Sequence, residues 1–228
     1  MPVIAIASSK GGSGKSTTTI VLAGEYAAAG YKVHIIDADK GGRVHSWGSQ
    51  GTTPAEISVS RANEETLRQE VEAAKKSAEV VLIDVEGSAN AALALAIGYA
   101  DGVLVTSNHS AWDVEDAFKT VRLIRDIEGM SKRQIPHGVV WSKVNTAIRS
   151  REIDALEAQV AQGGVGIVGQ LFDRTAFKSI VSFSTTLHLL NEADVPGLAK
   201  AKADAGALAE AVGALVSSGK VAKTEIAA

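Results

Sequence analysis

Cysteine is absent from the 228-residue chain, and this absence limits both its location and its chemistry. Without cysteine the protein can form no disulfide bond, and it has neither a thiol nucleophile nor a thiolate ligand for a metal. The absence fits a reducing compartment. We therefore expect a cytoplasmic protein whose chemistry depends on other side chains.

Long apolar runs and a secretory signal are also missing. No apolar run approaches the ~20 residues that a membrane-spanning helix needs, and the first residues lack the basic and then apolar pattern of a secretory signal. These features predict a protein without a membrane partner. Aromatic residues make up only 4% of the chain and hydrophobic residues 46%, so the core must be mainly aliphatic, which suits buried parallel strands.

An excess of charge of one sign is absent too. The net charge is −3, and basic and acidic residues balance one another beyond residue 142, so no basic block indicates a nucleic-acid surface. Two looser groups of basic residues remain, and a solvated helix face explains them as well as a DNA surface does. The first group is Lys119, Arg122, Arg125, Lys132 and Arg133, and the second is Arg149, Arg151, Arg174 and Lys178.

Apolar stretches alternate with stretches of helical periodicity along the chain. The predicted strands are Val3–Ala7, Val33–Asp37, Val80–Asp84, Gly102–Thr106, Gly138–Trp141 and Gly166–Leu171. The predicted helices are Lys15–Ala29, Glu64–Ser77, Ala89–Ala100, Val114–Glu128, Ser150–Gln162, Thr175–Ser182 and Leu198–Ser217. Gly30 and Gly129 are expected to end two of these helices.

This alternation predicts the architecture of the chain. Right-handed crossovers leave few alternatives to a doubly wound α/β fold, in which a mostly parallel sheet carries helices on both faces. We expect a single domain over residues 1–217, followed by a flexible tail over residues 218–228.

A glycine-rich loop follows the first predicted strand. Residues 10–17 read Lys-Gly-Gly-Ser-Gly-Lys-Ser-Thr, and the backbone N–H groups of such a loop, at the start of a helix, form a cradle for phosphate. Lys15 is expected to reach the β- and γ-phosphates of a nucleoside triphosphate, and the Ser16 hydroxyl to bind Mg²⁺. Ser9 stands where such loops usually begin with glycine. The predicted phosphate-binding residues are Gly11, Gly12, Ser13, Gly14, Lys15, Ser16 and Thr17.

Acidic residues end two of the predicted strands. Ligands bind beyond the carboxyl ends of the strands in such sheets, so Asp37 and Asp39 are expected to face the phosphates. Asp84 ends a later strand, where a carboxylate holds Mg²⁺ in phosphate-loop enzymes. Gly87 is expected to offer a backbone N–H group to the γ-phosphate. Glu86 fits a solvated loop residue better than a catalytic one.

The second lysine of the loop distinguishes it from a general phosphate-binding loop. Lys10 precedes the glycines although Lys15 already serves the nucleotide, and this arrangement resembles the ParA/MinD family of ATPases, which carry a deviant Walker A motif. The resemblance implies that Lys10 crosses a dimer interface to the phosphates bound by the other subunit. It covers residues 2–215 and is strongest to small ParA-type plasmid partition ATPases and to VirC-type ATPases of conjugative DNA transfer.

The resemblance also implies roles for residues outside the loop. Asp39 would orient or deprotonate the attacking water, and Asp37 would lie close to the Mg²⁺ shell. In the family this segment continues with Pro-Gln, whereas the chain has Lys40 and Gly41. Asn145 is expected to hydrogen-bond adenine, although an asparagine in a loop more often forms a turn. ATP is expected rather than GTP, because no Asn-Lys-x-Asp sequence that binds guanine is present.

By resemblance, the chain is expected to be a slow, Mg²⁺-dependent ATPase that closes into an ATP-bound sandwich homodimer and binds DNA non-specifically. A DNA-bound partner of the ParB type would stimulate hydrolysis, and the protein would lie in the cytoplasm or on the nucleoid. Conjugative DNA transfer, a MinD-like role at a membrane and a small-molecule kinase or ligase stay open as alternatives. Residues 214–228 argue against the membrane role, because they lack an aromatic anchor and offer only Lys220 and Lys223.

The three tryptophans, Trp47, Trp112 and Trp141, fit packing better than stacking on a base. Trp47 follows the first acidic segment, so packing against a dimer partner is a second interpretation for this residue.

Overall fold

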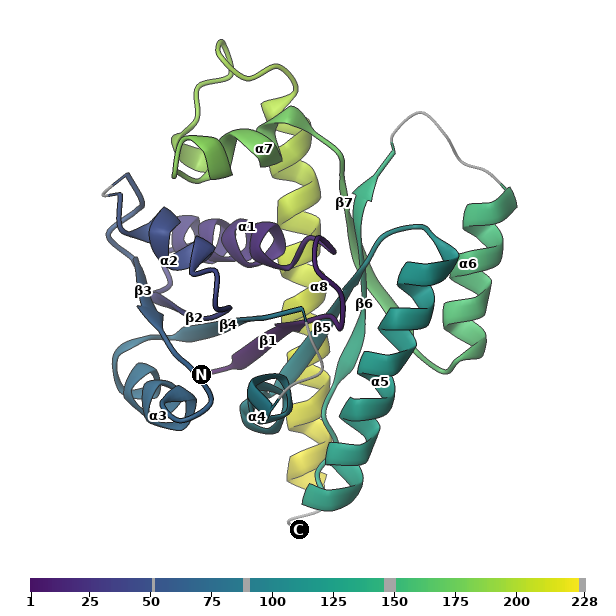
Figure 1. Cartoon of the computed structure of the whole chain (residues 1–228). Helices are drawn as coiled ribbons and strands as arrows, with labels where there is room; N and C mark the ends of the chain where they lie inside the picture. Colours follow the sequence, from purple (N-terminus) through teal and green to yellow (C-terminus); the bar gives the residue numbers. More distant parts are fainter. Residues whose placement is uncertain (51, 88–90, 146–150, 226–228) are drawn as a thin grey trace.

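The structure is a computed structural model that describes residues 1–50, 52–87, 91–145 and 151–225. Its strands form one sheet in the order β3-β2-β4-β1-β5-β6-β7, and all neighbouring strands are parallel (Figure 1). The strands are β1 (Val3–Ala7), β2 (Val33–Ala38), β3 (Ile57–Arg61), β4 (Val80–Val85), β5 (Gly102–Ser107), β6 (His137–Val144) and β7 (Gly166–Phe172).

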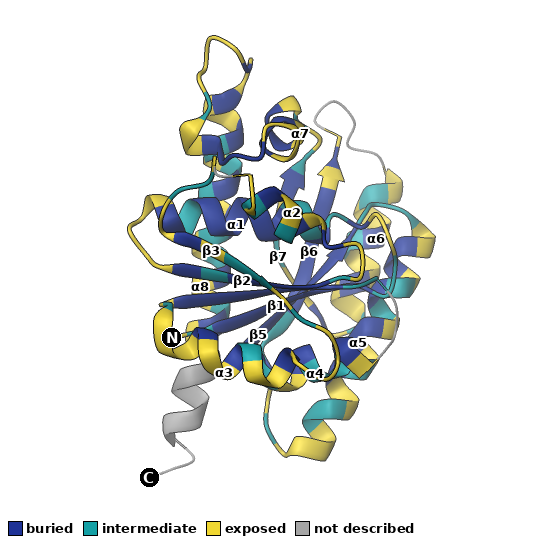
Figure 2. Cartoon of the chain, turned by 60° about the vertical axis from the view of Figure 1, so that its left-hand side comes forward, coloured by how far each residue is buried: buried dark blue, intermediate teal, exposed yellow. Residues whose placement is uncertain are grey.

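Helices cover both faces of this sheet (Figures 1 and 2). One face carries α3 (Leu67–Ser77), α4 (Ala91–Tyr99), α5 (Ala111–Ser131) and α6 (Arg151–Gln162). The other carries α1 (Lys15–Ala28), α2 (Arg43–Gly48), α7 (Thr175–Ser182), the 3-10 turn η1 (Leu187–Leu189) and α8 (Leu198–Glu225). The predicted α/β fold with a parallel sheet between two helical layers is therefore confirmed.

The central strands are buried on both sides, which explains their continuous apolar sequences. Along β1, Val3 and Ala5 enter the core beneath α3–α6, whereas Ile4 and Ile6 enter the core beneath α1 and α8. All residues of β1, β4 and β5 are buried. A fully buried parallel strand has no polar face, so its sequence shows no alternation.

The sequence pattern does not predict β3, α2 or η1. The edge strand β3 reads Ile-Ser-Val-Ser-Arg, an alternation typical of a half-buried strand rather than of the continuous apolar runs expected here, and α2 and η1 are too short to show helical periodicity. The predicted helix starts at Ala89 and Ser150 lie outside the described residues. None of the described helices is long and apolar enough to cross a membrane.

Two predicted boundaries of α5 are wrong. The helix begins at Ala111 rather than Val114, because the Ser110 hydroxyl accepts a hydrogen bond from the Asp113 N–H group and caps it. It passes Gly129 and ends before Lys132, which takes the left-handed conformation. Gly30 does end α1, with a φ of 87°.

The last helix also differs from the prediction. The sequence pattern predicts an end at Ser217 with a flexible tail beyond it, whereas α8 continues to Glu225. The predicted extent of the domain stays a prediction.

Candidate functional site

The glycine-rich loop joins β1 to α1 at the carboxyl edge of the sheet. Gly14 has a φ of 91°, and a Cβ atom there would lie 2.7 Å from the Cβ atom of Ser142, so only glycine fits between the loop and β6. The Ser142 hydroxyl donates a hydrogen bond of 2.6 Å to the Ser13 carbonyl, and the Ser13 and Thr106 hydroxyls are 2.9 Å apart. Strands β5 and β6 thus hold the loop in shape.

A cavity of about 400 Å³ lies against this loop. Its walls come from the loop and the start of α1, from the turn after β2, from the segment after β4 and from the end of β6. The lining residues are Gly11, Gly12, Gly14, Lys15, Ser16, Thr17, Asp39, Arg43, Glu86, Gly87 and Lys143. The structure therefore brings most of the predicted phosphate-site residues to one cavity. We call it the phosphate cavity.

Lys15 is buried at the base of the loop, with only 6% of its surface exposed. Its ammonium group donates a hydrogen bond of 2.9 Å to the Lys10 carbonyl. Burial lowers the pKa of Lys15, and the carboxylates of Asp84, Asp39 and Glu86 act in the opposite direction. The loop lysine is thus oriented toward the loop backbone that would hold phosphate.

Asp84 and Ser16 form the predicted metal-binding pair. The Ser16 hydroxyl donates a hydrogen bond of 2.7 Å to the buried carboxylate of Asp84. Burial raises the pKa of Asp84 to about 7, although the hydrogen bond from Ser16 lowers it. Mg²⁺ prefers oxygen ligands and usually takes only one or two carboxylates, with waters and substrate phosphates as its other ligands. The two side chains therefore fit the ion.

The turn after β2 is shaped by Asp37. Its carboxylate accepts hydrogen bonds from the Asp39 N–H group at 3.1 Å and from the His45 N–H group at 2.8 Å. Asp37 is fully buried and lies beside Asp84 in the register of β2 and β4. Its predicted place near Mg²⁺ stays a prediction. In this structure its carboxylate fixes the turn and the start of α2.

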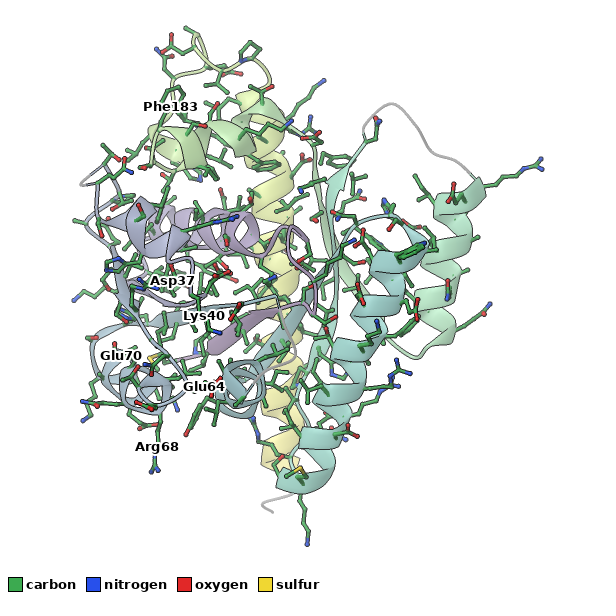
Figure 3. The ribbon with its side chains drawn as sticks, viewed as in Figure 1. Asp37, Lys40, Glu64, Arg68, Glu70 and Phe183 are labelled. Carbon is green, nitrogen blue, oxygen red and sulfur yellow. The ribbon has the colours of Figure 1, made fainter. Side chains whose placement is uncertain are left out.

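Asp39 lines the phosphate cavity from the same turn. Its carboxylate accepts a hydrogen bond of 2.7 Å from the Gly41 N–H group, which sets the orientation of the side chain. The ammonium group of Lys40 lies 3.6 Å from a carboxylate oxygen of Glu86. Figure 3 labels Asp37, near the end of β2, and Lys40, in the turn that follows.

Gly87 lies directly against the glycine-rich loop. A Cβ atom at Gly87 would lie 2.5 Å from the Lys10 carbonyl oxygen and 2.8 Å from the Gly11 nitrogen. The backbone at Gly87 also lines the phosphate cavity. This position is compatible with the predicted contact to the γ-phosphate, which stays a prediction.

Lys10 points away from the phosphate cavity. Its ammonium group lies 2.5 Å from the carboxylate of Asp113 in the first turn of α5, and 43% of the Lys10 side chain is exposed. This hydrogen bond raises the pKa of Lys10. Burial raises the pKa of Asp113, but hydrogen bonds from Lys10, Ser110 and Asn108 outweigh burial and hold it below its ordinary value. The sequence did not reveal this role of Asp113.

A second cavity, of about 500 Å³, opens beside the phosphate cavity. We call it the apolar cavity, because Leu171, Phe172, Phe177 and Val181 form much of its wall. The two cavities share Gly14, Thr17 and Lys143. A base attached to bound phosphates would therefore have a largely apolar wall available in the neighbouring cavity.

The end of β6 differs from the sequence expectation. Asn145 is exposed and lines neither cavity, so its contact with adenine stays a prediction. Lys143 lines both cavities, and its ammonium group donates a hydrogen bond of 2.9 Å to the Gly12 carbonyl. Its φ of 53° accompanies a register shift between β6 and β7. No sequence signal indicated this conformation, so Lys143 was missed.

Most of the suspected DNA-binding cations hold other partners. In the first group, Lys119 pairs with Asp116, and Arg125 and Arg133 donate to backbone carbonyl groups. In the second, Arg174 pairs with Asp204 and Lys178 with Asp173. Arg149 lies outside the described residues. The exposed members for which the described part of the chain provides no such contact are Arg122, Lys132 and Arg151.

The three tryptophans have different environments. Trp47 is 3% exposed, and its indole N–H group donates hydrogen bonds to the carbonyl groups of Ile180 and Thr185, so its proposed packing against a dimer partner is wrong. Trp141 is buried as expected. Trp112 contradicts the expectation of packing, because 80% of its surface is exposed.

A family model described as the CobQ/CobB/MinD/ParA nucleotide binding domain matches residues 4–187. The chain belongs to this family. It is also similar to Protein ParA of Rhizobium radiobacter, with 35% identity over 190 residues that cover 82% of this chain and 86% of that protein. This chain is thus a ParA/MinD-family ATPase similar to a ParA protein, as the sequence motifs predicted.

Solved structures share the fold of this ParA/MinD-family chain. The complex of McdA(D38A) with ATP from Cyanothece has a TM-score of 0.74 and 18% identity, and the match covers 93% of this chain and 96% of that one. A putative plasmid partition protein from Borrelia burgdorferi, bound to AMPPNP, has a TM-score of 0.68 and 16% identity, with coverage of 92% and 98%. At these identities the likeness concerns the fold alone.

Proposed function

We propose that the chain is a ParA-type ATPase that drives DNA partition by forming an ATP-bound sandwich dimer. One observation carries this proposal. The loop has two lysines, of which Lys15 lies within the phosphate cavity while Lys10 points outside it toward Asp113. Lys10 lies outside its own cavity with 43% of its side chain exposed, and in the dimer it would exchange Asp113 for the phosphates held by a second copy.

Within one copy, we propose that the phosphates of ATP occupy the phosphate cavity and that the nucleoside lies along the apolar cavity. Ser16 and Asp84 would hold Mg²⁺, which when bound neutralises phosphate charge. Asp39 would accept a hydrogen bond from the attacking water, since its carboxylate lines the cavity. Lys15 would bind phosphate oxygens from the base of the loop.

The ATP-bound dimer would bind DNA and leave it after hydrolysis. The proposal draws on the similarity to Protein ParA and on the likeness of fold to a putative plasmid partition protein. Contacts to DNA would be non-specific and directed at phosphates. A DNA-bound partner of the ParB type would stimulate hydrolysis and so release the dimer.

The proposal is tested by sedimentation of the protein with Mg²⁺ and ADP, with Mg²⁺ and ATP, and with ATP plus non-specific duplex DNA at low and raised salt. We expect dimers only with ATP, and DNA binding only by these dimers and only at low salt. A monomer in every state, or a dimer indifferent to nucleotide, would contradict the sandwich mechanism and favour a small-molecule kinase or ligase.

Two lysine variants separate the roles within the loop. We expect Lys10→Ala to retain nucleotide binding and to lose dimerisation with ATP or hydrolysis, because its ammonium group lies outside the cavity of its own chain. Lys15→Ala should lose nucleotide binding itself. Equal loss of binding in both variants, measured with a fluorescent ATP analogue, would exclude a role of Lys10 in a second copy.

A further inference from the structure

Arg43 is the first residue of α2, and its side chain lines the phosphate cavity from the side of Asp39. It is one of three cations in the cavity wall, together with Lys15 and Lys143. No sequence motif includes it. Its position raises the question of what an arginine does beside the site of phosphate chemistry.

The two lysines of the wall are already engaged with the loop. Lys15 donates a hydrogen bond to the Lys10 carbonyl and Lys143 to the Gly12 carbonyl, each at 2.9 Å. Arg43 is exposed, and within the described part of the chain its guanidinium group forms neither a hydrogen bond nor an ion pair. Its donors are therefore available to a ligand in the cavity.

Arg43 also lies next to the residue proposed to handle water. A Cβ atom built at Gly41 would lie 3.2 Å from an Asp39 carboxylate oxygen and 3.8 Å from both Cγ and Nε of Arg43. The two side chains thus flank the same glycine. If a water bound to Asp39 attacks the γ-phosphoryl group, that group would lie close to the Arg43 side chain.

The backbone that carries Arg43 is held from three sides. Asp37 accepts the N–H group of His45 within α2, and Arg61 on β3 donates a hydrogen bond of 3.0 Å to the Lys40 carbonyl. Trp47 anchors the end of α2 to the segment around α7. A positive group on a fixed support needs little reorganisation as negative charge develops in front of it.

We propose that Arg43 contacts the γ-phosphoryl oxygens of the ATP bound to its own chain and stabilises the charge that develops during hydrolysis. The proposal rests on the proposed function, because it requires ATP in the phosphate cavity. The water oxygen bonds to the γ-phosphorus while the bond to the bridging oxygen breaks and leaves its electron pair on ADP. The products are ADP and inorganic phosphate, and the proton of the water leaves through Asp39 to solvent. A guanidinium group keeps its charge at all working pH values and can bind two oxygens at once.

The first test compares Arg43→Ala with Arg43→Lys and with Arg68→Ala. Arg68 extends from α3 away from the phosphate cavity and serves as the matched control (Figure 3). We expect Arg43→Ala to lower ATP turnover by about 10²-fold, the effect of removing one preorganised donor to a transition state. Arg43→Lys should recover part of this loss, because it restores the charge but not the two-point contact. Arg68→Ala should match the wild type.

A binding measurement provides a second readout that does not depend on turnover. Affinity for ADP alone should be unchanged in Arg43→Ala, whereas affinity for ADP with aluminium fluoride, which imitates the transferred phosphoryl group, should fall by a similar factor to turnover. Wild-type turnover together with wild-type affinity for ADP and aluminium fluoride would overturn the proposal. If Arg43→Ala does not fold, the same comparison is made with Arg43→Lys.

Mixing experiments separate this inference from the proposed function. If Lys10 acts on the partner's nucleotide and Arg43 on its own, a mixed dimer of Lys10→Ala and Arg43→Ala has one intact site. Random pairing makes half of the dimers mixed, so a 1:1 mixture in which Lys10→Ala still pairs should reach about a quarter of wild-type turnover. Lys10→Ala mixed with Asp39→Ala should do the same.

The two mixtures have distinct outcomes. Recovery with Asp39→Ala but not with Arg43→Ala would overturn the assignment of Arg43 to its own chain and leave the dimer mechanism intact. No recovery in either mixture, where sedimentation shows that mixed dimers form, would contradict the role of Lys10 across the dimer. In that case, the turnover and aluminium fluoride measurements on Arg43→Ala alone still decide whether Arg43 contacts phosphate.

Discussion

At the scale of single residues, the shape of the glycine-rich loop depends on the close packing of the segment after β4 against it. The backbone at Gly87 touches the loop backbone at Lys10 and Gly11, and a Cβ atom would lie 2.5 Å from a carbonyl oxygen that Lys15 also binds. We expect Gly87→Ala to displace the loop, and a displacement of ~1 Å in a positioning element costs about 10²-fold in turnover. ATP turnover and the affinity for ATP measure this effect.

The matched control for Gly87→Ala is Gly98→Ala. Gly98 is an exposed residue of α4, and a Cβ atom there would meet no atom within 4 Å. Alanine should raise helix stability by about 0.5–1 kcal/mol and leave turnover unchanged. Wild-type turnover in Gly87→Ala would show that the loops can separate without loss.

The sequence predicted the residues whose role is encoded in a local pattern. Lys15, Ser16 and Asp84 follow from a loop between strand and helix and from an acid at a strand end, and the structure places them together. Arg43 and Lys143 could not be predicted in this way. Their positions depend on a short helix and on an irregular strand end with a positive φ at Lys143, and neither leaves a pattern in the sequence.

One missed contact did have a signal. Ser110 and Asp113 have the spacing of a helix cap, and this spacing predicts a helix start at Ala111, where α5 begins. The cap pattern therefore places the Asp113 carboxylate in the first turn of α5. Its pairing with Lys10 depends on tertiary structure, since the two residues lie far apart in the sequence.

At the scale of elements, Trp47 connects α2 to the segment around α7. Replacement by phenylalanine removes the indole N–H group and leaves the buried carbonyl groups of Ile180 and Thr185 without this donor. We expect Trp47→Phe to lower the free energy of unfolding by about 1–3 kcal/mol, the cost of a buried polar group that loses its partner. Urea denaturation at fixed nucleotide concentration measures this difference.

Trp112→Phe provides the comparison, because Trp112 is 80% exposed. A substitution at such a surface position should change the free energy of unfolding by no more than about 0.5 kcal/mol. Similar values for the two variants would mean that the indole hydrogen bonds of Trp47 contribute nothing to stability.

Long apolar elements were predictable, and short polar ones were not. Strand β1 has the predicted bounds, and β2, β4 and β5 exceed the predicted ones only slightly, because a buried strand shows as a continuous apolar run. The edge strand β3, which pairs with β2, alternates apolar and polar residues instead. This is the pattern of a half-buried strand, and an expectation of continuous apolar runs does not find it.

At the scale of the whole molecule, DNA binding would depend on few cations in each copy. Arg122 and Arg151 are exposed and hold no ion pair within the described ranges. We expect Arg122→Ala with Arg151→Ala to weaken binding to all duplex sequences alike. The slope of log affinity against log salt should become shallower by about 0.9 for each DNA phosphate that the variant no longer neutralises. Titrations of labelled duplex at several salt concentrations measure this slope.

Arg125→Ala is the control for this variant. Arg125 donates to the carbonyl groups of Gly163 and Gly164 and so joins α5 to the end of α6. Its replacement should lower thermal stability and leave the salt slope unchanged. A slope that changes with Arg125 but not with Arg122 and Arg151 would place the DNA surface elsewhere.

The position of β1 has a consequence for the order in which the chain can fold. Although β1 comes first in the sequence, Val3 pairs with Val81 on one side and Ile4 with Gly102 on the other. At a synthesis rate of about 5–20 residues per second, the ribosome needs on the order of 5–20 s to make the second of these neighbours. During that time the apolar strand and the attached glycine-rich loop have no sheet to join. The nucleotide site, though encoded early, is therefore among the later features to form, and a nascent chain would be most vulnerable to aggregation until β5 has emerged.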